Sequence, residues 1–110
     1  MTVQDKKYLA DILLAIELIE QFIAEITSFS DYSKDNKTRS AVERQIGIIG
    51  EAANKFDKLN PDNSLENIVQ IVGLRNRIIH AYDSIDDTVI WVIIKNYLPA
   101  LKTEVKQKLK

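Results

Sequence analysis

Apolar residues recur every three or four positions along most of this chain, and this period limits the possible folds more than any other feature. From Leu9 the stripe continues through Ile12, Ile16, Ile19, Ile23 and Ile26, with Leu13 and Phe22 beside it. Three glycines and two prolines in 110 residues leave few interruptions. The pattern therefore predicts amphipathic helices that bury one face each.

Four segments carry this period, and they cover residues 9–26, 41–59, 65–80 and 90–105. Ser64 is predicted to cap the third helix, and Asp86 or Asp87 the fourth. Pro99 is expected to kink the fourth helix or to begin a fifth. Residues 28–38, a polar stretch, are interpreted as a connection between helices. The prediction is an all-α, four- to five-helix up-and-down bundle, with residues 1–110 forming one domain.

The second and fourth helices each carry two adjacent apolar stripes, one more than a single packing contact would cover. A symmetric homodimer would bury the second stripe, so we expect this assembly. Gly47 and Gly50 lie inside the second helix, where glycine costs about 1 kcal/mol relative to alanine. Their presence predicts that another helix packs closely there.

Composition excludes several classes of site. The chain has no cysteine, which excludes disulfides, zinc-thiolate sites and thiol nucleophiles. Its formal net charge is -1, so any contact with RNA must be local. We find no signal peptide and no segment of membrane-spanning length, and expect a soluble, cytoplasmic protein that contacts no membrane. Nothing in the pattern calls for a cofactor.

His80 is the single histidine and the side chain best suited to proton transfer near neutral pH. Asn76 precedes it by one helical turn, so its amide could orient the imidazole. Arg75 and Arg77 offer guanidinium groups for a local phosphate site. A histidine near a helix end often only packs or compensates the helix dipole, so the neighbouring residues decide its interpretation.

Two further features have competing interpretations. Tyr82 lies two residues beyond His80, where its phenol could face a partner or cap the core. Glu43 and Glu51 lie on similar sides of the second helix and could suggest a metal site. Because no histidine or aspartate clusters with them, a solvated or structural role is favoured and no metal is predicted.

Residues 75–82, RNRIIHAY, match the R-x4-H-x-Y signature of HepT-like toxins in the HEPN ribonuclease superfamily, which this chain resembles. The likeness extends over roughly residues 38–101. It includes AVER at 41–44, IIGEAAN at 48–54, GLRNR at 73–77, Val92, and Leu98-Pro99. Ala81 stands where glycine is frequent in the family, and Asp83 follows the tyrosine where the pattern is loose. Neither departure removes a functional group.

The resemblance implies a metal-independent RNA endonuclease that acts as the toxin of a toxin-antitoxin pair, with the arginine and histidine facing their symmetry mates across a dimer. Arg75, Asn76 and His80 would then be catalytic, and Arg75 and Arg77 would bind RNA. The expected partner is a minimal nucleotidyltransferase antitoxin that adenylylates Tyr82.

Two other interpretations stay open at this point. The chain could be a non-catalytic helical subunit that presents Tyr82 or a nucleotide pocket to a nucleotidyltransferase. It could also be an interaction-only helical dimer in which Arg75 and His80 stabilise a helix end.

Overall fold

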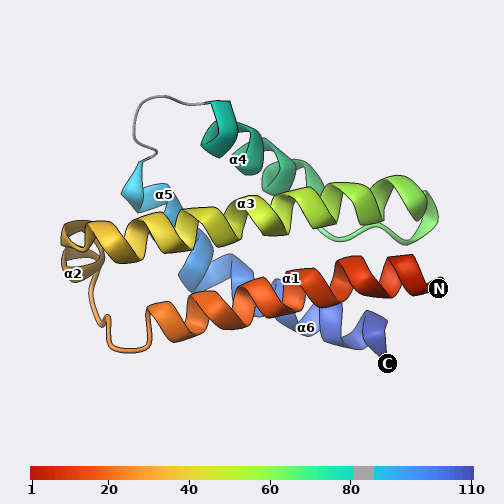
Figure 1. The fold of residues 1–110 in the computed structure, drawn as a ribbon, viewed down its shortest axis with the longest axis horizontal. Coiled ribbons are helices and arrows are strands. Elements are labelled where there is room, and N and C mark those ends of the chain that lie inside the picture. Colours follow the sequence, from red (N-terminus) through yellow and green to blue (C-terminus); the bar gives the residue numbers. More distant parts are fainter. Residues whose placement is uncertain (81–85) are drawn as a thin grey trace.

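The fold is an all-α bundle, seen in a computed structural model that describes residues 1–80 and 86–110, with the backbone alone for 77–80 (Figure 1). Its elements are α1 (Val3–Phe22), α2 (Phe29–Lys34), α3 (Asn36–Leu59), η1 (Pro61–Asn63), α4 (Ile68–His80), α5 (Asp87–Val92), η2 (Ile93–Tyr97) and α6 (Leu98–Leu109). Every regular element in these residues is helical, as the apolar period predicts. No helix among them is long and apolar enough to cross a membrane.

The two long helices α1 and α3 run antiparallel side by side, with α6 against α1 and α4 against α3 (Figure 1). Buried side chains from all four of these helices meet in one core, which also takes in Tyr32 and Ile90. One predicted stripe of α3 is buried along its whole length, and it consists of Val42, Ile46, Ile49, Ala53 and Phe56. The second predicted stripe consists of Ala41, Ile48, Ala52 and Leu59, of which Ile48 and Leu59 are exposed. That second face of α3 is therefore only partly used within one chain.

Helix α1 begins six residues before the predicted stripe because a capping box starts it. The Thr2 side chain accepts from the Asp5 amide, and the Asp5 carboxylate accepts from the Thr2 amide. The Asn60 side chain also donates to Asp5, at 3.0 Å, which ties the start of α1 to the end of α3. At its other end α1 stops at Phe22, and Ile23 and Ile26 pack against the core from beyond the helix.

The polar stretch before α3 contains a short helix, α2, that the apolar period does not reveal. Ser28 caps this helix. The side chain of Tyr32 is buried and packs against the ring of Trp91 on α5, with the ring centroids 5.3 Å apart. Asp87 then joins three elements, since it accepts from Ser33 at 3.1 Å and pairs with Arg39 at 3.2 Å. The predicted plain connection is therefore wrong for residues 29–34.

Ser64 does not cap the third long helix, which corrects the sequence prediction. Its hydroxyl donates instead to the Pro61 carbonyl, and the chain continues through the buried Leu65 before α4 begins at Ile68. Asn67 adopts a left-handed conformation, with φ of 59°, immediately before the helix. Burial of Leu65 and the turn at Asn67 together delay the helix by one turn.

The fourth predicted helix is interrupted near Pro99, as expected. Asp86 caps α5 by accepting from the Thr88 amide. The chain then passes through a short π-helix, η2, at whose end the Leu98 amide donates to the Ile93 carbonyl, five residues back. Pro99 lies in the first turn of α6, where its missing N–H costs least. The proline therefore divides one long apolar pattern into two helices.

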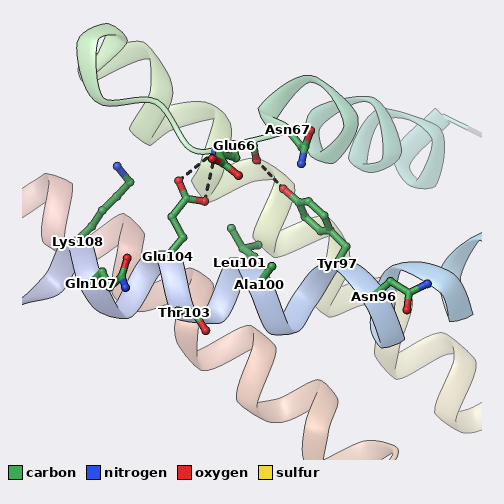
Figure 2. Close-up of a pocket in the computed structure, with 10 residues that line it drawn as sticks. All are labelled: Glu66, Asn67, Asn96, Tyr97, Ala100, Leu101, Thr103, Glu104, Gln107 and Lys108. Carbon is green, nitrogen blue, oxygen red and sulfur yellow. Dashed lines mark hydrogen bonds between the residues drawn. The ribbon is translucent and has the colours of Figure 1, made fainter.

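A clamp from η2 and α6 holds the segment that leads into α4 (Figure 2). The Glu66 amide donates to the Glu104 carboxylate, with oxygens at 3.1 and 3.3 Å. The Tyr97 hydroxyl donates to the Glu66 carbonyl at 2.7 Å. Burial, followed by the charges of Glu104 and Glu66, raises the pKa of Tyr97 to about 12, so it stays a donor. The backbone of one residue, Glu66, is thus fixed at both its N–H and its C=O.

Candidate active site

Arg75 lies on α4 where this helix crosses α3, and Gly50 makes the crossing possible. A Cβ atom built on Gly50 would overlap the Cβ of Arg75, and would lie 2.9 Å from its Cγ and 3.1 Å from the Ile71 carbonyl oxygen. The predicted close packing at Gly50 is therefore confirmed. The stem of the arginine rests directly on the backbone of α3.

The guanidinium group of Arg75 is held by two acceptors. Nη2 donates to Glu51 Oε2 on α3, and Nη1 donates to Asn76 Oδ1 at 2.8 Å. Hydrogen bonding from Arg75 is the main cause that lowers the pKa of Glu51, and Lys55 adds to it. Arg75 is 24% exposed and Glu51 44% exposed, so solvent reaches the pair. The arginine is fixed in place but remains accessible.

Asn76 contacts Arg75, whereas the sequence suggested that its amide would orient His80. The side chains of Arg77 and His80 lie outside the described part, so this suggested contact stays a prediction. The backbone of α4 is described as far as His80, and the helix end expected at the motif stays a prediction. Tyr82 falls outside the described residues.

Among the described residues, Glu43 and Glu51 do not gather with further metal ligands. Glu51 pairs with Arg75 and Lys55, which agrees with the structural role favoured for it. Burial is the main cause that raises the pKa of Glu43, which makes its charged form less stable than in water. Across the described residues, no three or more histidine, cysteine, aspartate or glutamate side chains gather in one place.

An apolar groove of about 600 Å³ runs beside α4, between this helix and the chain from α5 to η2. Ile46 and Ile49 of α3 contribute to its lining, together with Ile71 and Leu74 of α4 and Val92 of α5. Val92 is 48% exposed. The groove therefore borders the helix that carries Arg75, and its exposed apolar residue is Val92 on α5.

A second hollow, of about 670 Å³, lies along α6 (Figure 2). Its lining includes the three residues of the clamp, Glu66, Tyr97 and Glu104, together with Lys108. Two carboxylates make it unsuited to an RNA phosphate. Arg75 is not among its lining residues, so this hollow is separate from the candidate site.

Sequence reasoning did not identify Glu51 as the partner of Arg75. The two residues are separated by 24 positions, and no local pattern links them. The one available signal was Gly50, since an interior glycine marks where another helix approaches. Glu51, which follows Gly50, was therefore a candidate for contact with the helix that packs against this glycine.

The chain matches the family model described as Ribonuclease HepT-like over residues 12–107. It is 43% identical to "Probable ribonuclease HepT" of Thermococcus cleftensis over 101 residues, 88% of each chain. It is 34% identical to a protein of Methanocaldococcus jannaschii named "Putative RNase" over 105 residues, 92% of this chain and 93% of the relative.

A third relative, also named "Putative RNase" and from Caldanaerobacter subterraneus, is 32% identical over 103 residues, 93% of this chain and 91% of the relative. No solved structure gives a significant match. The family model covers most of the chain and the residues that build the Arg75 site on α3 and α4. The chain belongs to the HepT-like ribonuclease family.

Proposed function

We propose that this protein is a metal-independent RNA endonuclease and the toxin of a toxin-antitoxin pair, with Arg75 and His80 in its active site. The observation that carries the proposal is Arg75 on α4, which is anchored yet accessible and lies five residues before His80. Membership of the HepT-like ribonuclease family supports the same conclusion.

The proposed reaction uses the ribose 2'-hydroxyl as nucleophile. One histidine accepts the 2'-hydroxyl proton as the oxygen attacks phosphorus, and a second protonates the leaving 5'-oxygen. His80 from each of two protomers supplies these two groups, because each chain has one histidine. Arg75 stabilises the charge on the phosphorane, and Asn76 holds the guanidinium in place. Arg77 adds a further contact to RNA phosphate.

A homodimer is part of this proposal. The apolar groove beside α4 lies on the helix that carries Arg75, so pairing along it would bring two copies of the motif together. Exposed Val92 supports burial of this surface in an assembly. The expected product is one composite active site for each pair of chains.

The proposed partner is a minimal nucleotidyltransferase antitoxin that transfers AMP from ATP to the Tyr82 hydroxyl and releases pyrophosphate. The added phosphate would compete with RNA for Arg75 through charge-assisted hydrogen bonds. Tyr82→Phe should stay folded and escape silencing. Peptide mass spectrometry after incubation with ATP and the partner tests this, and unmodified Tyr82 in a silenced sample would contradict it.

Cleavage of a labelled RNA by purified variants tests the nuclease assignment. His80→Ala should abolish cleavage and Arg75→Ala should reduce it severely, with helicity unchanged by circular dichroism. Lys106→Ala is the control, since it removes an exposed cation of α6, a helix that contributes none of the proposed site residues. Parental cleavage by His80→Ala, or activity that requires added magnesium after chelation, would contradict the proposal.

A further inference from the structure

Glu51 supplies an acidic acceptor to the guanidinium group of Arg75. Its carboxylate accepts from Arg75 Nη2, and the planar fork of guanidinium donors can bind either a carboxylate or a phosphate. Gly50, the residue before it, brings the backbone of α3 against the arginine stem. The acceptor is therefore built into the helix crossing.

Glu51 also has a second cation available. Its Oε1 atom lies 3.4 Å from Lys55 Nζ, one helical turn further along α3, while Oε2 receives Arg75. Lys55 is 51% exposed, so its side chain has room to adjust. If Arg75 turned toward another anion, the carboxylate would keep a counter-charge. Release of the arginine would therefore not leave Glu51 uncompensated.

The Arg75–Glu51 pair is suited to exchange. Both groups reach solvent, and exposed ion pairs contribute little to stability because water screens them. Asn76 holds Nη1 on the other side, so the guanidinium can turn from one acceptor while another still fixes it. A phosphodiester arriving from solvent meets a preoriented arginine.

We propose that Glu51 is a positioning residue that holds Arg75 in the RNA-free protein and is replaced by an RNA phosphate on binding, while Lys55 takes over the carboxylate. This inference rests on the proposed nuclease function and deepens it. Glu51 then lowers the affinity of the protein for RNA, and it keeps the Arg75 guanidinium in one orientation in the RNA-free protein.

Binding of a fluorescein-labelled 2'-O-methyl 20-mer, which lacks the attacking hydroxyl, tests the exchange by fluorescence anisotropy. Glu51→Gln should bind about two- to fivefold more tightly, the range expected from losing one exposed ion pair. The slope of log K against log salt should stay the same, because Arg75 contacts one phosphate in both complexes. Glu43→Gln is the matched control on α3 and should change neither quantity.

A double-mutant cycle separates exchange from general repulsion by a carboxylate. The tightening caused by Glu51→Gln should vanish in the Arg75→Ala background. Lys55→Met should weaken binding more in the parent than in Glu51→Gln, since the lysine acts through the carboxylate. In cleavage assays Glu51→Gln should lower KM without raising kcat. Equal tightening with and without Arg75, or no tightening, would overturn the inference.

A titration with inorganic phosphate keeps this test independent of RNA. The NMR signal of the Arg75 Nε–Hε group is assigned by its loss in Arg75→Lys. This signal should shift at a lower phosphate concentration in Glu51→Gln than in the parent. The same midpoint in both proteins would overturn the inference. If no variant bound the oligonucleotide, the nuclease proposal would fail, and the phosphate midpoints would still decide the role of Glu51.

Discussion

Gly50 on α3 leaves the space that the stem of Arg75 occupies on α4, and this contact joins the fold to the candidate active site. The nearest neighbours of a Cβ atom at Gly50 include the Cβ of Arg75 and the carbonyl oxygen of Ile71, and the backbone of α4 fixes both of these atoms. Any side chain at position 50 must therefore move α4. The stability of the bundle and the position of the guanidinium group therefore depend on the same contact between Gly50 and Arg75.

Gly50→Ala should lower the free energy of unfolding by about 1–3 kcal/mol, because overpacking outweighs the gain in helix propensity. Gly73→Ala is the matched control, since no heavy atom of a described neighbour lies within 4 Å of a Cβ built there. It should raise the free energy of unfolding by up to about 1 kcal/mol. Urea denaturation measures both, and equal stability of the two variants would contradict the close contact.

Loss of the Glu66 clamp should loosen the start of α4. Tyr97→Phe and Glu104→Gln each remove or weaken a hydrogen bond to the Glu66 backbone and should cost about 1 kcal/mol. Their effects should not add, because both act on the backbone of one residue. Hydrogen exchange should increase over residues 66–76, whereas Gln107→Ala, an exposed residue of the same hollow, should leave it unchanged. Parental exchange in the double variant would show that the clamp is unimportant.

Asp5 should make stability depend on pH in the acid range. The Thr2 amide and then the Asn60 side chain hold its pKa below the ordinary 3.8. A carboxyl group with a lowered pKa in the folded state contributes fully above its unfolded pKa, and this contribution is lost as pH falls through the folded value. Asp5→Asn should therefore flatten the decline of stability below about pH 5, and Asn60→Ala should flatten it partly. A decline as steep as in the parent would contradict this role.

Replacement of Val92 by arginine should prevent dimer formation if the groove beside α4 is the interface. A charge at this exposed groove residue would be buried without a partner in the dimer. Leu14→Arg is the control, because Leu14 is 59% exposed on α1 and does not line the groove. Light scattering should give a monomer for the first variant and a dimer for the second. A parent that cleaves RNA as a monomer would contradict the composite site.

The sequence by itself determined the features that depend on neighbours along the chain. Helical periodicity follows from which side chains share a face, so the all-α fold, the Asp86 cap and the break near Pro99 could be predicted. Helix α2 was missed because six residues are too few to show a stripe.

The tertiary structure alone decided which distant groups meet. Burial of Leu65 overrode the capping signal of Ser64, and the clamp on Glu66 comes from residues more than 30 positions away. The pairing of Glu51 with Arg75 likewise depends on where two helices cross, which the period of either helix leaves undetermined. A helical pattern specifies the face that is buried, whereas the contact made by each residue on that face depends on the packing of the whole bundle.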